Sequence, residues 1–344
     1  MAKATTDGAG PPAVLPEGKI DPELLAPLLP GAPGNSAAPA GVLIGAAVGE
    51  DAAVVAGAAR LVLTSDPITL AGHALGRYTV AVNCNDLVAM GAVPRYLTTS
   101  ILLPRGTTRD ALEELFMELA AAATAAGIAW VGGHTEVTGA VVSAVVVGAA
   151  VGVLEGEHWS SAGARPGDAL VLTKWVALEG CTLLARERPD ARSILGAEHA
   201  AMVRWLDDPG ISVVAEGRVL RGHAIHAAHD PTEGGVAQGV HELALRSAVA
   251  IELTAAALPI KPATRLLCSA LEIDPLGLLA SGALLFTAAP EEARAAVAAL
   301  QAANIAATEI GTVRAGSGVT LRAGNRRRPL SSFPQDEISR LARQ

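Results

Sequence analysis

LVLTSDPITLAGHALGRYTVAVNCNDLVAMGAVPRYLTTSILLP, residues 61–104, is the stretch that decides the fold of this chain. Its opening apolar run, Leu61–Leu63, predicts a buried strand, and Tyr96–Leu103 predicts another. The segment between them, Ala74–Met90, has the length of a helix. We therefore expect a strand, a helix and a second strand in this part of the chain.

Acidic side chains interrupt this apolar stretch. Asp66 is expected at the end of the first strand, and Asp86 is expected within the helix. Buried carboxylates are costly unless cations or hydrogen-bond donors compensate their charge. Few cations are at hand, because the chain has four lysines and the nearby arginines are only Arg77 and Arg95. A divalent metal is therefore the favoured partner, since one ion can compensate the charge of several carboxylates.

Length, composition and charge limit the class of protein. With 344 residues, the chain is long enough for two domains. The net charge of −8 argues against a surface for nucleic acid or anionic membranes, and the basic run 326–328 is interpreted as a solvated turn. Three widely spaced cysteines form no zinc pattern and favour a reducing compartment. The apolar stretches fall short of the ~20 residues of a membrane span, and no signal peptide opens the chain. We therefore expect a cytoplasmic protein.

Turn-rich segments divide the chain into predicted domains. Residues 1–17 are rich in Gly, Ala and Pro and are expected to form a mobile tail. An N-terminal domain with an Ala- and Val-rich sheet is predicted over 18–158. The turn-rich stretch 160–168 separates it from a C-terminal domain over 165–330, in which helices and strands alternate. A terminal helix is predicted over 331–344, and the fold class is α/β (α+β).

A predicted helix and strand lead to a pair of glycines. Thr107–Ala126 begins with threonines that can cap a helix, and Gly127 stops it. Ile128–Val131 predicts a strand that ends in a turn at Gly132 and Gly133. Two glycines at a strand end allow a phosphate to approach the backbone closely. A Gly-Gly turn is also common without any ligand.

Two further turns carry acids. Glu50 and Asp51 follow a glycine in an apolar context, and Asp230, Thr232 and Glu233 lie between a predicted strand and a predicted helix. Solvated turn acids would account for either turn alone, but the acids of residues 61–104 favour a shared metal site. Mg²⁺ prefers carboxylate oxygens together with substrate phosphates. Phosphoryl transfer depends mainly on positioning and charge neutralisation, so an enzyme acting on a magnesium nucleotide is indicated.

Five motifs occur in an order that resembles one superfamily of enzymes. They are GEDAAV (49–54), TSDPIT (64–69), NCNDLVAMGAVP (83–94), GGHTEVT (132–138) and HDPTEGG (229–235). The chain resembles the superfamily of aminoimidazole ribonucleotide (AIR) synthetase, selenophosphate synthetase, thiamine-monophosphate kinase and the hydrogenase-maturation protein HypE. The similarity covers about residues 18–325, and it is greatest to the HypE-like branch, often called AIR synthase-related.

This resemblance implies a fold and a ligand. The expected fold is PurM-like, with an N-terminal sheet that pairs with that of a second subunit in a dimeric β-barrel. A C-terminal α/β domain follows, and ATP is expected between the domains. The resemblance assigns Asp51, Asp66 and Asp86 to magnesium and adds Asp230 from the second domain. A helix cap or an ordinary turn acid is the alternative for each of them.

Several positions depart from the family pattern. His134 stands where the family has an acidic ligand, and a neutral imidazole favours softer metals than Mg²⁺. Glu136 occupies a position that is lysine in HypE. The last cysteine is Cys268, so the C-terminal cysteine of HypE is missing, and Ala280–Ala283 lacks an expected glutamate. Dehydration of a carbamoylated terminal cysteine is therefore not expected.

We predict a homodimer that binds Mg²⁺ and ATP and transfers a phosphoryl group to a small molecule or to a protein-bound group. One alternative is a small-molecule kinase like thiamine-monophosphate kinase, since His73 follows Asp66 at the spacing of a histidine near the substrate of those enzymes. The other is a non-catalytic partner in hydrogenase or metallocentre maturation. The assigned residues are Asp86, His134 and Glu136 for catalysis; Lys19, Asp51, Asp66, Asn85, Asp86, Gly132, Gly133, Thr135, Asp230, Thr232 and Glu233 for the nucleotide; His73 for the substrate; and Asp51, Asp66, Asp86 and Asp230 for the metal.

Overall fold

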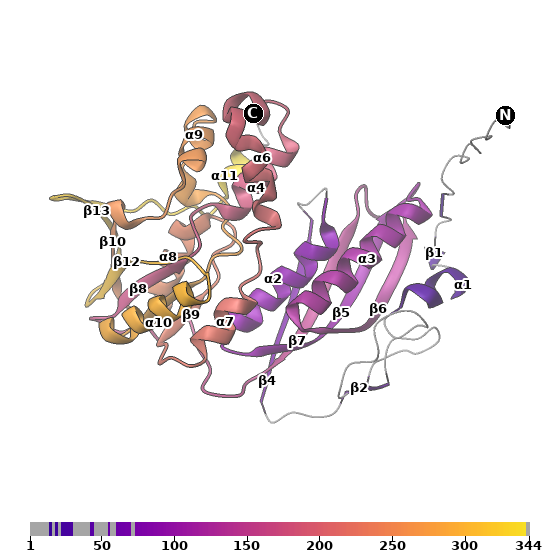
Figure 1. The fold of residues 1–344 in the computed structure, drawn as a ribbon, viewed down its shortest axis with the longest axis horizontal. Helices are drawn as coiled ribbons and strands as arrows, with labels where there is room; N and C mark the ends of the chain where they lie inside the picture. Colours follow the sequence, from indigo (N-terminus) through magenta and orange to yellow (C-terminus); the bar gives the residue numbers. More distant parts are fainter. Residues whose placement is uncertain are drawn as a thin grey trace, which may run out of the picture. The chain divides into compact units, whose positions relative to one another are not determined.

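The computed structural model describes residues 14–15, 18–19, 22–29, 42–44, 54–55, 60–69 and 73–341. The chain forms two compact units (Figure 1). The first unit includes Leu63–Asn83 and Arg95–Val151, and the second includes Cys84–Pro94 and the chain from Gly152 onward. Both units combine helices with a sheet, as the α/β (α+β) prediction requires.

The first unit is built on a five-stranded sheet with the strand order β1-β6-β5-β7-β4. β5 and β6 run parallel, and β1 lies antiparallel to β6. Two longer helices accompany this sheet, and two short helices and the paired strands β2 and β3 complete the described elements. The bounds are β1 Gly18–Lys19, α1 Pro22–Leu25, η1 Ala26–Leu28, β2 Val42–Ile44, β3 Val54–Val55, β4 Leu61–Ile68, α2 Leu75–Ala89, β5 Val93–Pro104, α3 Arg109–Ala126, β6 Ala129–Thr138 and β7 Val145–Val153.

The ends of α3 confirm the capping signals in the sequence. Thr108 has extended backbone angles, and its hydroxyl accepts a hydrogen bond of 3.2 Å from the Ala111 N–H. Gly127 ends the helix in the left-handed conformation, with φ of 73°. One side of α3, including Leu112 and Leu119, is buried, so an amphipathic helix covers the sheet as its pattern predicts.

Two predicted strand ends in the first unit were wrong. β4 continues to Ile68, so Asp66 lies inside the strand rather than at its end. β6 runs without interruption through Gly132 and Gly133 to Thr138, so the predicted glycine turn is a strand. In both cases the pairing of neighbouring strands carries the extended backbone past the polar or glycine residues that suggested an end.

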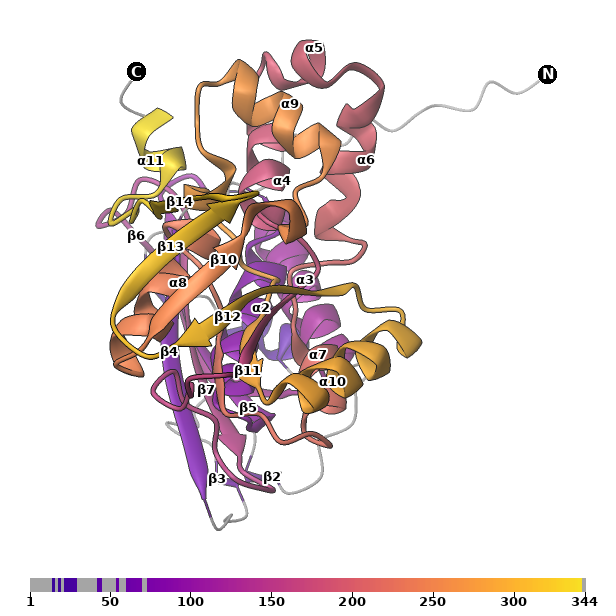
Figure 2. The same ribbon diagram turned by 90° about the vertical axis from the view of Figure 1, so that its left-hand side faces the viewer.

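The second unit contains a seven-stranded sheet with the order β14-β13-β10-β12-β8-β11-β9, and Figure 2 shows β13, β10 and β12 side by side. β13 runs parallel to β10, while β12 runs antiparallel to both β10 and β8. The bounds are β8 Ala169–Thr173, α4 Leu178–Glu187, α5 Ala191–Leu195, η2 Gly196–Glu198, α6 His199–Val203, η3 Arg204–Leu206, α7 Val214–Leu220, β9 Ala227–His229, α8 Gly235–Arg246, β10 Ala250–Thr254, η4 Ala255–Ala257, α9 Pro262–Ala270, η5 Pro275–Gly277, β11 Leu285–Ala288, α10 Pro290–Ala302, β12 Ala307–Arg314, β13 Gly318–Ala323, β14 Arg326–Pro329 and α11 Glu337–Leu341.

Helices cover both faces of this sheet. Side chains alternate between faces along a strand, and Leu170 and Leu172 of β8 join the apolar core that also holds residues of α4, α8 and α9. Helix α10 contacts β8, β11 and β12, and its buried residues Ala293, Ala296 and Leu300 lie outside that core cluster. Strand β8 is consequently buried along its whole length.

The end of the chain differs from its prediction in two places. Arg326–Arg328, interpreted as a solvated turn, belongs to the edge strand β14, where its side chains are exposed. Basic residues are common at sheet edges because they discourage further strand pairing. The terminal helix is shorter than residues 331–344, because α11 begins after Asp336, whose carboxylate accepts from the Ile338 N–H at 2.9 Å. Across the part of the chain that the structure describes, the helices are too short or too polar to cross a bilayer.

Candidate functional site

Asp66 is held in place through its backbone. Its N–H donates a hydrogen bond of 3.2 Å to the Oδ1 atom of Asn83, which lies on α2. The Nδ2 atom of Asn83 donates in turn to the carbonyl of Thr79 at 2.9 Å. Asn83 is completely buried and fills the space above Gly148 of β7, where a Cβ atom would lie 2.2 Å from Nδ2. This contact fixes the strand that carries Asp66 and leaves its half-buried carboxylate uninvolved.

The glycine pair of β6 serves the packing of the sheet. Gly132 and Gly133 have φ of 149° and 151°, which residues other than glycine rarely adopt. A Cβ atom on Gly133 would lie 1.8 Å from the carbonyl oxygen of Thr99 on β5. The pairing of β5 with β6 also shifts by one residue just before Thr98. The glycines are thus required by an irregularity in strand pairing, and a role in phosphate binding stays a prediction.

The residues after the glycines divide between solvent and core. Thr135 is buried, whereas His134 is exposed. The Nε2 atom of His134 lies 3.4 Å from Oε2 of Glu136, and both side chains are substantially exposed. An ion pair of this kind contributes little to stability. The predicted catalytic roles of His134 and Glu136 stay predictions.

His73 lies just before α2, where Ala74 has a positive φ of 60°. The side chain of His73 is exposed, and its charge acts on Glu118 of α3. Burial raises the pKa of Glu118, while the hydrogen bond that it accepts from the Gly76 N–H at 3.2 Å, and then Arg77 and His73, act in the opposite direction. The predicted substrate role of His73 stays a prediction.

Asp86 and Asn85 lie on the last part of α2, which belongs to the second unit. Asp86 is half-buried, whereas Asn85 is completely buried. The Nδ2 atom of Asn85 donates to the carbonyl of Ile211 at 2.9 Å, and its Oδ1 accepts from the Val213 N–H at 2.9 Å. Both polar groups of Asn85 are therefore used within the protein. The side chain of Asn85 thus holds residues 211–213, and its assignment to nucleotide binding stays a prediction.

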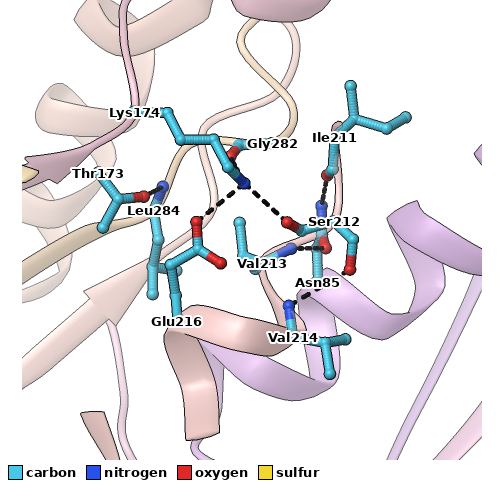
Figure 3. A network of polar contacts seen from close by, with 10 residues as sticks. All are labelled: Asn85, Thr173, Lys174, Ile211, Ser212, Val213, Val214, Glu216, Gly282 and Leu284. Carbon is cyan, nitrogen blue, oxygen red and sulfur yellow. Dashed lines mark hydrogen bonds and ion pairs between the residues drawn. The ribbon is translucent and has the colours of Figure 1, made fainter. Parts of the chain in front are cut away.

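The sequence analysis did not predict the buried ion pair of Lys174 and Glu216, which lies next to residues 211–213 (Figure 3). Lys174, at the end of β8, is only 5% exposed, and its Nζ lies 2.8 Å from Oε1 of Glu216 on α7. Nζ also donates to the carbonyl oxygens of Ser212 at 2.7 Å and Gly282 at 2.8 Å. A lysine directly after a largely apolar strand can also turn toward solvent, so the local pattern did not reveal its burial.

The predicted acids of the second domain lie in one loop, residues 230–235, which we call the acid loop. Asp230 is buried directly after β9, Thr232 is half-buried and Glu233 is exposed. The carbonyl of Thr232 accepts from the N–H groups of Gly235 and Ala280, at 3.1 and 3.3 Å. The acid loop is thus tied to the segment around Ala280.

Two more buried acids accompany the acid loop. Burial raises the pKa of the Glu179 carboxyl to about 7, against hydrogen bonds from the side chain and backbone of Ser281, and the charges of Asp336 and Glu233 raise it further. Burial likewise raises the pKa of Asp336, which accepts from the Gly234 N–H at 2.8 Å. Oε2 of Glu179 has no hydrogen-bond partner among the described residues. Glu179 follows an apolar run, and this context was the only sign of its burial.

The three cysteines of the sequence are all buried within the described residues. Burial raises the pKa of the Cys84 thiol to about 12, with Asp86 adding to the effect. The pKa of Cys268 is also raised, first by a hydrogen bond with Cys181 and then by burial. A thiol must lose its proton to act as a nucleophile, so these two are inert.

The predicted ligands are only partly described. Asp51 lies outside the described residues, and for Lys19 the structure gives the backbone alone. Asp66 belongs to the first unit, while Asp86 and Asp230 belong to the second. Within the described ranges, no three His, Cys, Asp or Glu side chains form a group that could hold a metal by themselves. Mg²⁺ needs only one or two protein carboxylates when phosphates and waters complete its shell.

Comparison with known proteins identifies both parts of the chain. Residues 49–154 match the N-terminal domain of AIR synthase related proteins, and residues 165–324 match the C-terminal domain. The carbamoyl dehydratase HypE of Escherichia coli (strain K12) is 32% identical over 266 residues, which cover 74% of this chain and 75% of that protein.

Solved structures agree with this match. A crystal structure of E. coli HypE, a hydrogenase maturation protein, is 27% identical, with a TM-score of 0.75 over 86% of this chain and 94% of that one. The hydrogenase maturation protein HypE in complex with ATP has a TM-score of 0.70 at 26% identity, covering 84% of this chain and 90% of that one. Thiamine-monophosphate kinase from Stenotrophomonas maltophilia K279a has a TM-score of 0.67 at 26% identity, with coverage of 82% and 91%. The chain therefore belongs to the AIR synthase-related family and has the PurM-like fold that it shares with HypE.

Proposed function

We propose that this protein is a Mg-ATP-dependent phosphoryl-transfer enzyme whose acceptor is a small molecule or a group on another protein. The observation that carries the proposal is the ATP complex of HypE, a family member that matches this chain across both domains. The acid-rich segments of the chain supply the oxygen ligands that such a nucleotide requires. The active form is proposed to be a homodimer.

The metal would be held by Asp51, Asp66 and Asp86, with Asp230 added from the second domain. The chemistry of these donors fits Mg²⁺, because all four are carboxylates, and the exposed His134 is a poorer ligand for it. When bound, Mg²⁺ would neutralise charge on the phosphates.

The other residues of the site would bind and orient the nucleotide. Thr232 and Glu233 are proposed to contact it from the acid loop, and Thr135 from β6. Lys19 would add a cation near the phosphates, and Gly132 and Gly133 are the least favoured of the assigned residues because strand packing already explains them.

The experiment that tests this function is ATP hydrolysis with and without Mg²⁺. We expect hydrolysis that depends on Mg²⁺ and is lost in Asp86→Asn, which keeps the size of the side chain and removes its charge. Asp190→Asn is the matched control, because Asp190 forms an exposed ion pair with Arg188 at 2.8 Å. Hydrolysis that survives in Asp86→Asn would contradict the assignment, and a folded protein that neither binds nor hydrolyses ATP would contradict the function.

The leading alternative is a small-molecule kinase. It is favoured by the thiamine-monophosphate kinase from S. maltophilia, which matches over most of both chains. ADP formation stimulated by thiamine monophosphate, and weakened in His73→Ala, would select this alternative. Dehydration at a carbamoylated cysteine, the reaction that the name of HypE describes, has no support from Cys84 or Cys268, because both thiols are buried with raised pKa. A non-catalytic maturation partner would bind its protein partner without ATP turnover.

A further inference from the structure

Lys174 joins two segments of the second unit that are far apart in the sequence, residues 211–216 and residues 280–282 (Figure 3). Its ammonium group contacts the carbonyl oxygens of Ser212 and Gly282 and the carboxylate of Glu216, at 2.7, 2.8 and 2.8 Å. Two of its three N–H groups donate to the carbonyl oxygens, and the Glu216 carboxylate lies at ion-pair distance. Lys174 has a positive φ of 52°, which residues other than glycine seldom adopt, so its backbone is constrained.

The first of these segments leads to Asp86. Ser212 lies between Ile211 and Val213, whose carbonyl and N–H hold the side chain of Asn85. Asn85 directly precedes Asp86 on α2. Any movement of residues 211–213 would therefore be transmitted to the turn of α2 that carries Asp86.

The second segment leads to the acid loop. Ala280, two residues before Gly282, donates its N–H to the carbonyl of Thr232 at 3.3 Å. Ser281 meets the buried carboxyl of Glu179. Gly282 also packs directly on the first segment, because a Cβ atom there would lie 2.6 Å from Cα of Ile211. Lys174 thus contacts both segments at the point where they touch.

We propose that Lys174 is a positioning residue that holds Asp86 and the acid loop in a fixed mutual arrangement for Mg-ATP. The inference rests on the proposed function. Lys174 itself would contact neither the metal nor the nucleotide. Lysine suits the position, because its compact ammonium group can donate to two converging carbonyl oxygens and lie beside a carboxylate at the same time. Arginine presents a planar fork, which does not fit that geometry. Glu216 compensates the charge, so the pair can stay buried.

The test compares Lys174→Met with two other variants. The double variant Lys174→Met/Glu216→Leu also removes the carboxylate, so that no unpaired charge stays buried, and it still lacks both carbonyl contacts. Leu267→Ala truncates a completely buried side chain on α9 and lowers stability without touching the network. The dissociation constant of Mg-ATP is measured by calorimetric titration at a temperature at which all variants are folded. Amide hydrogen exchange is followed in residues 84–90 and 230–235.

We expect Lys174→Met to weaken Mg-ATP binding roughly tenfold and to accelerate exchange in both segments together. Leu267→Ala should bind Mg-ATP about as the wild type does, and the double variant should bind it as weakly as Lys174→Met. Wild-type binding by Lys174→Met, or faster exchange in only one segment, would overturn the inference. If the wild type itself does not bind Mg-ATP, the proposed function fails. In that case the exchange measurement decides whether Lys174 couples the two segments.

Discussion

Replacing Glu179 with glutamine should remove a pH dependence from the stability of the protein. The pKa of this buried carboxyl is raised from its ordinary value of 4.5 to about 7, first by burial. Between these two values the unfolded chain has lost the proton while the folded protein retains it. The stabilising contribution is therefore complete below the ordinary value and is lost as the pH rises through about 7.

The magnitude follows from the size of the pKa change. At ~1.4 kcal/mol for each pKa unit, the full effect is roughly 3–4 kcal/mol, and most of it falls between pH 5 and pH 8.5. Glutamine resembles the protonated acid and can accept the same hydrogen bonds from Ser281, so Glu179→Gln should lose this dependence. We expect the variant to gain stability relative to the wild type by roughly 2–3 kcal/mol over that range.

Urea unfolding at a series of pH values measures this difference. The neighbouring Asp336, whose pKa is also raised by burial, is present in both proteins, so its own contribution largely cancels. Glu291→Gln, at an exposed position on α10, is the control and should keep a constant difference from the wild type. A Glu179→Gln difference that does not change between pH 5 and pH 8.5 would refute the burial of an uncharged carboxyl.

Three further substitutions test other parts of the account. Lys174→Met leaves the Glu216 carboxylate buried without its cation and should lower the free energy of unfolding, measured by urea denaturation, by about 3–5 kcal/mol. The double variant with Glu216→Leu should recover part of this loss. Equal stability of the single variant and the wild type would contradict the buried pair. Gly133→Ala should destabilise the first unit by more than about 3 kcal/mol, because its Cβ would lie 1.8 Å from the carbonyl oxygen of Thr99. A melting temperature within about 2 °C of the wild type would argue against the strand irregularity. Thr108→Ala should cost about 1 kcal/mol through loss of the α3 cap, and thermal unfolding without a shift would show that the cap hydrogen bond contributes nothing.

Local signals in the sequence predicted many elements well. The threonine cap and the glycine stop of α3 were both predicted. These signals act within a few residues, so they can be recognised without knowing what the segment packs against. The order of the motifs gave the family, which the comparisons confirm for both domains.

The errors arose where strand pairing or packing between distant segments decides the structure. A glycine pair usually marks a turn, but the approach of Thr99 across the sheet makes it part of β6. The hydrogen bonds of Asn85 with residues 211–213 were likewise not predicted, because they join segments more than a hundred residues apart. Lys174, Glu179 and Asp336 could not be found for the same reason. Their importance comes from burial and from partners that only the fold brings together.

The most direct test of the central proposal is a crystal structure of the protein with Mg²⁺ and a non-hydrolysable ATP analogue. The account predicts one metal in contact with carboxylates from the set Asp51, Asp66, Asp86 and Asp230, with the triphosphate beside the acid loop. A nucleotide bound elsewhere, with those four carboxylates free of metal, would contradict it.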